Sequence, residues 1–169
     1  MRVLITGGVK SGKSSRALGL ALENFSPPRY FIATAEKTDA EMEQRIARHR
    51  GERRGPDGND LFVTLEEPVD LPGAIARAGN MILVDCIPMW INNLMYYKKT
   101  DLFPGFLEKI TAAMPENIIF VTNETGLGNI PFDETTRQYN LLLAEANREL
   151  ARMVHRVEFM VCGIPLTVK

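Results

Sequence analysis

The stretch that decides the fold is MRVLITGGVKSGKSS, residues 1–15. Its apolar run Val3-Leu4-Ile5 leads into GGVKSGKS, residues 7–14, which fits the pattern G-x-x-x-x-G-K-[ST] without a mismatch. The pattern predicts a strand, then a glycine turn whose backbone N–H groups converge on phosphate oxygens, then a helix whose positive end faces the same anion. In such a loop Lys13 reaches the β- and γ-phosphates, and the Ser14 hydroxyl is a ligand for Mg²⁺.

A chance glycine turn before a helix is the alternative interpretation of this motif. Here the motif lies between a β-type run and a helical run at residues 15–23, which is the context that a true phosphate loop requires. We therefore interpret the chain as a nucleotide-binding protein. The loop residues expected to hold the phosphates are Gly7, Gly8, Val9, Lys10, Ser11, Gly12, Lys13 and Ser14.

The length and composition are those of an ordinary globular protein. A chain of 169 residues predicts one domain, residues 1–169, with a substantial core. The chain is 45% hydrophobic and 24% charged, and its formal net charge of −1 argues against a general nucleic-acid binder. No apolar stretch approaches the length of a membrane span, and no signal-peptide pattern opens the chain. We expect no stable membrane insertion and a cytoplasmic location.

The two cysteines do not make a disulfide framework. Cys86 and Cys162 each lie at or beside an apolar run. We expect both to be small core residues of a protein from a reducing compartment.

Strand and helix patterns alternate along the chain. Strands are predicted at residues 2–6, 30–34, 61–65, 81–85, 117–122 and 157–162, and helices at residues 14–24, 40–50, 71–78, 88–97, 102–113 and 135–154. This order predicts an α/β fold with a largely parallel sheet covered by helices on both faces. Thr38 or Asp39 is expected to cap the second helix, and residues 51–60 are turn-rich. The helix at residues 88–97 has a predicted apolar face of Met89, Trp90, Leu94 and Tyr97.

Two acidic residues follow predicted core strands. Asp85 ends the strand at residues 81–85, and a carboxylate there points into the crevice where α/β proteins bind ligands. Opposite a phosphate loop, this position favours a Walker B role in which Asp85 holds Mg²⁺ directly or through water. Capping of the next helix is the alternative. Glu124 follows the strand at residues 117–122 and is expected at the same rim, or in a cap or turn role.

One of the two histidines lies among cations. His49 is near the end of a predicted helix that carries Arg45 one turn earlier and Arg50 beside it. Nearby cations lower the pKa of an imidazole and keep it neutral near pH 7. A neutral imidazole beside arginines that hold a triphosphate could attack the α-phosphorus and form a covalent nucleotidyl-histidine. A surface histidine, or one that hydrogen-bonds phosphate, is the alternative that the residues alone leave open.

Seven segments, taken in order from Val3 to Pro165, resemble one enzyme family. They are TGGVKSGKSS (6–15), IATA (32–35), EMEQRIARHR (41–50), TLEEP (64–68), VDCIPMWINNL (84–94), VTNETGLG (121–128) and VCGIP (161–165). The chain is similar to the bifunctional adenosylcobinamide kinase/adenosylcobinamide-phosphate guanylyltransferase family of cobalamin biosynthesis. The R-I-x-x-H-R and VTNE-x-G-x-G patterns are the most specific parts of this resemblance.

The resemblance implies a single-domain, RecA-like P-loop fold, a homotrimer and two reactions. ATP or GTP phosphorylates the aminopropanol hydroxyl of adenosylcobinamide. GTP then leaves GMP on a histidine with release of pyrophosphate, and the GMP passes to adenosylcobinamide phosphate to give adenosylcobinamide-GDP. The family's guanylylated histidine falls on His49, and Lys13 is the second catalytic residue. Ser14 and Asp85 would hold Mg²⁺. The family's GTP contacts map onto residues 7–14 and onto Ala33, Thr34, Ala35, Arg50, Gly51, Glu52, Arg53, Glu66 and Asp85.

The chain departs from the family pattern at several positions. Arg48 stands where some members have a second histidine, so the assignment of His49 is unambiguous. Phe62 stands where many members have tryptophan, and residues 53–60 form a longer, more glycine-rich link. Residues 137–140 read RQYN in place of the family's usual R-x-F-R-D run, in a region that the resemblance associates with corrinoid binding. Acceptor binding is therefore the inference that the resemblance supports least.

Two other functions remain as alternatives at the level of sequence. The first is a small-molecule kinase in which His49 binds phosphate and no nucleotidyl-enzyme forms. The second is a regulatory nucleotide-binding module without acceptor chemistry. The chain has no N-K-x-D guanine signature, which weakens that second interpretation.

Overall fold

The computed structural model describes residues 1–37, 39–128 and 130–169, without the side chain of Arg45. In chain order the elements are β1 (Arg2–Gly7), α1 (Lys13–Asn24), β2 (Tyr30–Ala33), α2 (Ala40–Gly51), β3 (Val63–Glu66), α3 (Leu71–Ala78), β4 (Ile82–Asp85), α4 (Ile87–Tyr96), a short 3₁₀ helix η1 (Thr100–Leu102), α5 (Phe103–Ala112), β5 (Ile118–Val121), α6 (Glu134–Met153), β6 (Arg156–Val161) and β7 (Ile164–Thr167). The helices and strands predicted from the sequence all occur, with ends shifted by one or two residues.

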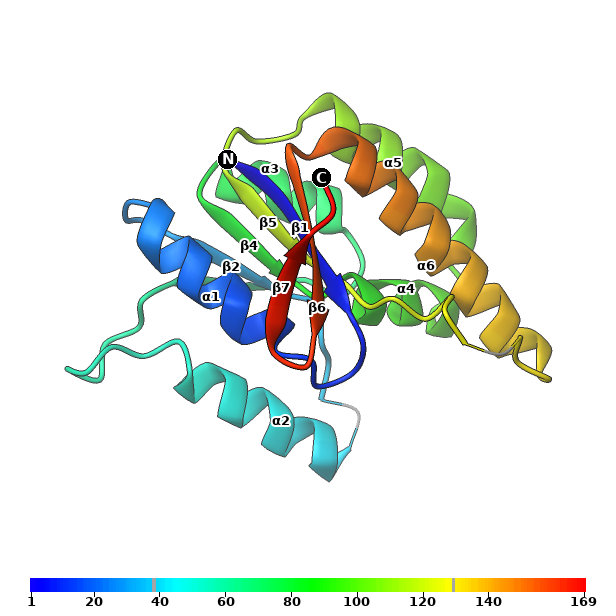
Figure 1. Cartoon of the computed structure of the whole chain (residues 1–169), viewed down its shortest axis with the longest axis horizontal. Coiled ribbons are helices and arrows are strands. Elements are labelled where there is room, and N and C mark those ends of the chain that lie inside the picture. The colour runs from blue at the N-terminus through cyan, green and yellow to red at the C-terminus, as the bar shows by residue number, and fades with distance from the viewer. Residues whose placement is uncertain (38, 129) are drawn as a thin grey trace.

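The strands form one twisted sheet in the order β3-β2-β4-β5-β1-β6-β7 (Figure 1). Every neighbouring pair from β3 to β6 is parallel, which confirms the predicted α/β class with a largely parallel sheet. The carboxyl ends of these strands therefore meet at one edge. The loop after β1 and the end of β4 lie at this edge, separated by β5.

Strand β7 is absent from the sequence prediction. It pairs antiparallel with β6 across the turn Cys162-Gly163, and both turn residues have positive φ, 52° and 82°. Two such residues suit the tight turns that join hairpin strands. All four residues of β7 are exposed, so no alternation marks the strand, and Pro165 is tolerated because β7 is at the sheet edge. The expectation that Cys162 is a core residue is wrong, because it is exposed in this turn.

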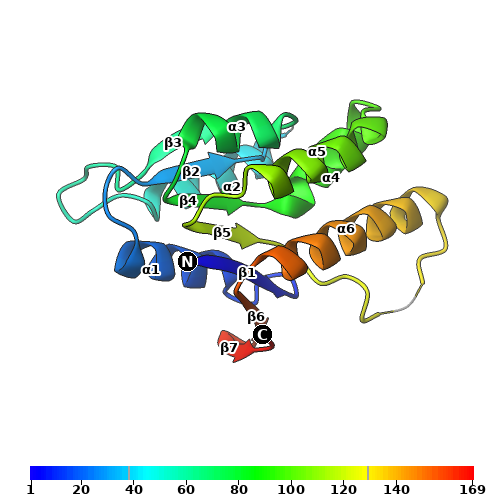
Figure 2. The same ribbon diagram turned by 90° about the horizontal axis from the view of Figure 1, so that it is seen from above.

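Helices cover both faces of the sheet, as predicted. Val3 and Ile5 of β1 face α1, whereas Leu4 faces the side covered by α3, α4, α5 and α6 (Figure 2). This alternation is the two-residue period of a strand buried on both faces. Each large apolar side chain that is fully buried in this way contributes about 1.5–3 kcal/mol to folding.

Helix α4 buries only part of its predicted apolar face. Trp90 and Leu94 are fully buried, and the Trp90 ring lies against Phe103 at a centroid distance of 5.7 Å. Tyr97, by contrast, is 43% exposed. Its assignment to the apolar face was wrong because α4 ends at Tyr96 and the hydroxyl of Tyr97 donates a hydrogen bond to Glu36 at 2.9 Å.

Helix α2 lies apart from these layers, beyond the carboxyl edge of the sheet (Figure 1). Its N-terminus is capped by Asp39, which accepts a hydrogen bond from the Met42 amide at 2.7 Å. Thr38, the other predicted cap, lies outside the described residues. Acidic residues occupy the first turn and basic residues the last, as the helix dipole favours. Within the described parts of the chain, no helix is long and apolar enough to cross a membrane.

Candidate nucleotide site

The loop between β1 and α1 has the backbone geometry of a phosphate cradle. Gly7 has φ 148°, and a Cβ there would lie 2.5 Å from the Met160 carbonyl oxygen, so only glycine fits. Gly12 precedes α1 with φ 92°. The ammonium of Lys13 folds back over the loop and donates to the Gly8 carbonyl at 2.5 Å. The first turn of α1 has no acidic residue, so the positive end of the helix is available to an anion.

Two buried hydroxyl groups lie at the end of β1 and in the loop that follows it. Among the described residues, the side-chain oxygens of Thr6 and Ser11 are buried and have no hydrogen-bond partner. Leaving a buried hydroxyl unpaired costs free energy, which a ligand at the loop can recover. The chance-turn interpretation of the motif does not explain these features.

A cavity of about 400 Å³ opens beside the loop at the carboxyl edge of the sheet. Ser14 of α1 and Asp85 at the end of β4 both line it. The N-cap of α4 is Cys86, so the alternative in which Asp85 caps this helix is not what the structure shows. A volume of this size is in the range of pockets that bind small ligands.

The residues present fit Mg²⁺. Ser14 and Asp85 offer a hydroxyl and a carboxylate oxygen, which are the ligand types that Mg²⁺ prefers. No group of three or more His, Cys, Asp or Glu side chains within metal-binding reach occurs in residues 1–37, 39–128 and 130–169. A site with two protein oxygens is typical of Mg²⁺ that completes its shell with substrate phosphates and water.

Helix α2 brings His49 to the same cavity. Met42, Ile46 and His49 all line the cavity, and their spacing of four and three residues places them on one face of the helix. The Nδ1 atom of His49 lies 3.0 Å from Oε2 of Glu52, the residue at the C-cap of α2. Only cations were expected around His49, so this carboxylate is a neighbour that the sequence pattern did not predict.

Two arginines after His49 form another wall of the cavity. Arg50 makes an ion pair with Glu66 of β3. Arg53 is 6% exposed, and its guanidinium stacks on the Phe31 ring at 3.9 Å from the centroid. Burial lowers the pKa of Arg53, an effect that the Asp85 carboxylate opposes. The positive charge of Arg53 and the negative charge of Asp85 thus attract each other across the site.

Two buried polar side chains hold the floor of the cavity. The Thr34 hydroxyl donates to the Cys86 carbonyl at 2.7 Å and accepts from the Cys86 amide at 2.9 Å, which ties the end of β2 to the end of β4. The Asn93 amide nitrogen donates to the carbonyls of Thr34 at 2.7 Å and Pro68 at 3.0 Å. The sequence analysis missed Asn93. The feature of the sequence that could have indicated its role is a polar residue between Trp90 and Leu94 in a mostly apolar helix.

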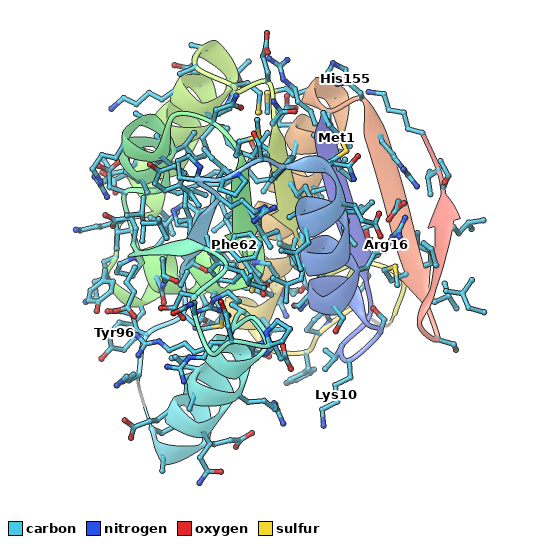
Figure 3. The ribbon with its side chains drawn as sticks, turned by 90° about the vertical axis from the view of Figure 1, so that its left-hand side faces the viewer. Met1, Lys10, Arg16, Phe62, Tyr96 and His155 are labelled. Atoms are coloured by element: carbon cyan, nitrogen blue, oxygen red, sulfur yellow. The ribbon has the colours of Figure 1, made fainter. Side chains whose placement is uncertain are left out.

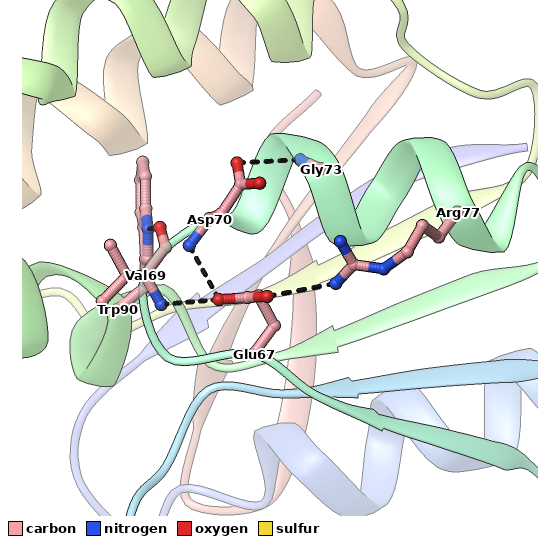
Figure 4. Close-up of polar contacts among 6 residues, drawn as sticks. All are labelled: Glu67, Val69, Asp70, Gly73, Arg77 and Trp90. Carbon is pink, nitrogen blue, oxygen red and sulfur yellow. Dashed lines mark hydrogen bonds and ion pairs between the residues drawn. The ribbon is translucent and has the colours of Figure 1, made fainter.

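The turn between β3 and α3 is equally fixed (Figure 4). One oxygen of Glu67, a cavity residue, accepts hydrogen bonds from the amides of Asp70 at 2.9 Å and Val69 at 3.2 Å, and the other oxygen pairs with Arg77 at 3.0 Å. Burial raises the pKa of Glu67, but these hydrogen bonds together bring it below its ordinary value. The Trp90 indole donates to the Val69 carbonyl at 2.8 Å. This wall is therefore preformed before any ligand binds.

The structure brings together many, but not all, of the predicted site residues. Those that line the cavity are Ser14, Ala33, Ala35, His49, Arg50, Arg53, Glu66 and Asp85. Those outside its lining are Gly7, Gly8, Val9, Lys10, Ser11, Gly12, Lys13, Thr34, Gly51 and Glu52. Glu124 reaches the rim, because its amide donates to the Gly7 carbonyl at 3.2 Å. Its carboxylate accepts from the Gly126 amide at 2.7 Å, which is the turn role.

Sequence comparison relates the chain to proteins of known name. A family profile described as cobinamide kinase / cobinamide phosphate guanyltransferase matches residues 3–168. The chain is 39% identical to the bifunctional adenosylcobalamin biosynthesis protein CobP of Pseudomonas aeruginosa, over all of this chain and 98% of that protein. It is 28% and 29% identical to the bifunctional adenosylcobalamin biosynthesis proteins CobU of Escherichia coli and Salmonella typhimurium, over the full length of both chains in each case.

Structural comparison gives a more distant likeness. The P4 protein of bacteriophage phi6, solved in complex with ADP, matches with a TM-score of 0.42 and 14% identity. The match covers 97% of this chain and 52% of that protein. The assignment of the fold rests on the sheet topology and the loop geometry, not on this likeness.

Proposed function

Since the chain belongs to the cobinamide kinase / cobinamide phosphate guanyltransferase family, we propose which of its residues carry each of the two reactions. The family makes the chain a bifunctional enzyme of adenosylcobalamin biosynthesis. One observation carries the assignment: Ser14 of the phosphate loop, Asp85 of β4 and His49 of α2 all line one cavity. A nucleoside triphosphate in that cavity has its phosphates, its metal and an imidazole within one space.

In the first reaction the phosphate loop presents the γ-phosphate of ATP or GTP. The aminopropanol hydroxyl oxygen of adenosylcobinamide attacks the γ-phosphorus, the bond from this phosphorus to the β-bridging oxygen breaks, and the hydroxyl proton passes to water. Lys13 stabilises the charge on the β- and γ-phosphates, together with the backbone amides of the loop. Ser14 and Asp85 would hold Mg²⁺, and the charge of this ion would offset that of the phosphates.

In the second reaction the imidazole of His49 attacks the α-phosphorus of GTP. A P–N bond forms, the bond to the bridging oxygen breaks and pyrophosphate leaves. With Nδ1–H donated to Glu52, the lone pair is on Nε2, the atom that attacks. A phosphate oxygen of adenosylcobinamide phosphate then attacks the same phosphorus. The P–N bond breaks, His49 is released, and adenosylcobinamide-GDP is formed.

The remaining predicted contacts surround the nucleotide in this proposal. Arg50 and Arg53 supply positive charge beside the phosphates, and Glu66 and the backbone of residues 33–35 and 51–52 receive the guanosine half. Arg53 is preorganised by its stacking on Phe31, so little side-chain entropy is lost when it meets the ligand.

Intact-mass analysis after addition of GTP and Mg²⁺ tests the proposal. The wild-type protein should gain the mass of GMP and release pyrophosphate. His49→Ala should gain nothing, whereas His155→Ala, which changes the other histidine at an exposed position, should form the adduct as the wild type does. A folded His49→Ala protein that still gains GMP would show that another residue is the nucleophile.

We propose further that one domain, residues 1–169, carries both activities in a cytoplasmic homotrimer. Exposed apolar side chains support an assembly, because a monomer rarely leaves such groups together at its surface. In the β6–β7 hairpin they are Val161, Ile164 and Leu166. Sedimentation equilibrium should give three times the mass of the chain, and a monomer mass would contradict this part of the proposal.

A further inference from the structure

The cavity beside the phosphate loop is too small for both substrates. Its volume of about 400 Å³ suits one small ligand, such as the nucleotide. The acceptor is a large flat corrin ring that carries the reacting hydroxyl at the end of a side arm. The arm must reach into the cavity while the ring stays outside, so the ring needs a surface at the cavity mouth. This inference rests on the proposed function, which supplies the acceptor.

Helix α4 leads from the cavity to an exposed aromatic pair. Met89, in its first turn, lines the cavity, and Tyr96 follows seven residues later. Seven residues make two helical turns, so Tyr96 lies on the same face of α4 as Met89 and about 10 Å further along the axis. Tyr96 is 77% exposed. Figure 3 places Tyr96 at the outer edge of the molecule, in the lower half of the view, where α2 and Lys10 also lie.

The pair is held in place by a residue of the cavity itself. The Tyr97 hydroxyl donates to both carboxylate oxygens of Glu36, at 3.1 and 2.9 Å, and Glu36 lines the cavity. The rings of Tyr96 and Tyr97 are 5.1 Å apart and nearly perpendicular, at 84°. Lys99 lies 6.0 Å from the Tyr97 centroid, so that ring already has a cation near it. The Tyr96 ring is the more exposed of the two.

The chemistry of this surface matches that of the acceptor. Flat conjugated rings, including the adenine of the adenosyl group, stack on exposed aromatic side chains. We propose that Tyr96, positioned by Tyr97 and Glu36, is the docking surface for the corrin or adenosyl face of the acceptor.

A second exposed aromatic residue provides a matched comparison. Phe132, before α6, is fully exposed but does not line the cavity, and no ring contact joins it to a cavity residue within the described chain. Phe132→Ala therefore removes as much exposed aromatic surface as Tyr96→Ala, at a place that the proposal does not use.

Steady-state kinetics of the kinase reaction tests the proposal, because that reaction needs the acceptor but not His49. With ATP saturating, Tyr96→Ala should raise the KM for adenosylcobinamide about tenfold, which is the loss of one stacking contact. Tyr96→Phe, which keeps the ring, should stay within about twofold of wild type, as should Phe132→Ala. Equilibrium dialysis of adenosylcobinamide, followed by its corrin absorbance, should show the same order of affinities.

The GTP half-reaction separates this proposal from the proposed function. Tyr96→Ala should form the GMP adduct at the wild-type rate, since no acceptor takes part. An unchanged KM in Tyr96→Ala, or an equal rise in Phe132→Ala, overturns the docking surface. An equal loss of adduct formation in Tyr96→Ala also overturns it, because the residue then acts on the nucleotide site. Absence of the adduct in the wild type refutes the role of His49 and leaves the acceptor KM as an independent result.

Discussion

The Nδ1 atom of His49 and the Oε2 atom of Glu52 lie 3.0 Å apart at the end of α2. The two residues are one helical turn apart, and the turn that ends the helix aims both side chains toward each other. A neutral His49 that donates to Glu52 carries its proton on Nδ1 and its lone pair on Nε2. In the proposed function, this contact orients the imidazole that attacks GTP.

Replacement of Glu52 should slow formation of the GMP adduct. Glu52→Ala removes the hydrogen bond that orients His49, and we expect a loss of roughly 10- to 100-fold in the rate at saturating GTP, the range for partners that orient a functional imidazole. Glu52→Gln keeps an acceptor and should lose less. Single-turnover mass analysis measures the rate. Glu43→Ala, an exposed change on the same helix, is the control, and a Glu52→Ala protein that reacts at the wild-type rate contradicts the prediction.

Removal of Lys13 should abolish both reactions together. Its ammonium lies over the loop at the Gly8 carbonyl, and in the proposed function it stabilises the β- and γ-phosphates. We expect Lys13→Ala to lower the rates of phosphorylation and of adduct formation by about 10²- to 10³-fold, as for loss of one preorganised charge-stabilising group. Lys109→Ala on α5 is the exposed control. Retention of either reaction would mean that the loop serves only the other one.

Asn93 should matter for stability although it touches no ligand. Asn93→Ala takes the donor from the buried carbonyl of Thr34 and from the part-buried carbonyl of Pro68, and leaving a buried polar group unpaired costs about 1–3 kcal/mol. We expect urea unfolding to show a loss of about 2–4 kcal/mol, and GTP binding to weaken because the cavity floor loosens. Asn92→Ala, at the exposed neighbouring position, should stay within about 0.5 kcal/mol of wild type. Equal stability of the two variants would show that Asn93 does not brace the floor.

Glu158 should make the stability of the protein depend on acid pH. This fully buried carboxylate of β6 accepts two hydrogen bonds from Arg16 of α1, at 2.9 and 3.0 Å, and also pairs with Arg156. The hydrogen bonds from Arg16 lower its pKa in the folded state. A lowered folded-state pKa gives stability that is present above the unfolded value, about 4.3, and is lost as the pH falls through the folded value.

The corresponding experiment compares wild type with Glu158→Gln. At pH 7 the variant should be less stable by about 2 kcal/mol, in the range for hydrogen bonds to charged groups. The difference should shrink as the pH drops below about 4, because the wild-type carboxylate is then protonated too. Glu108→Gln, at an exposed position of α5, should show no such trend. A stability difference that stays constant from pH 7 to pH 3 would exclude the carboxylate as its source.

The fold could be predicted largely from the sequence because its signals are local. Apolar runs, glycine turns and capping residues mark the strands and helices. The alternation of strands with helices predicts that neighbouring strands are parallel. Strand β7 was not predicted, because an exposed edge strand with a proline has no apolar pattern. The residue type of Cys162 also does not indicate its positive φ. Tyr97 was misassigned since a periodic pattern does not tell where a helix ends.

The site was predictable only where a motif is contiguous. The phosphate loop and Asp85 follow from strand ends, whereas Asn93 joins α4 to two carbonyls that are 59 and 25 residues away. Glu52 was expected as a GTP contact. Its contact with His49 depends on the backbone conformation at the C-cap of α2, which the sequence pattern does not give. Such contacts depend on tertiary packing. They cannot be predicted from a short segment of one sequence.

The chain contains a single G-x-x-x-x-G-K-[ST] motif, at residues 7–14. On the proposed assignment, both reactions draw their triphosphate from this one loop, so they are separated in time and not in space. The ADP or GDP that stays bound at the loop after the first reaction would keep GTP from reaching His49. The ratio of spent to fresh nucleotide around the protein thereby sets the pace of the second reaction through occupancy alone, with no regulatory site required.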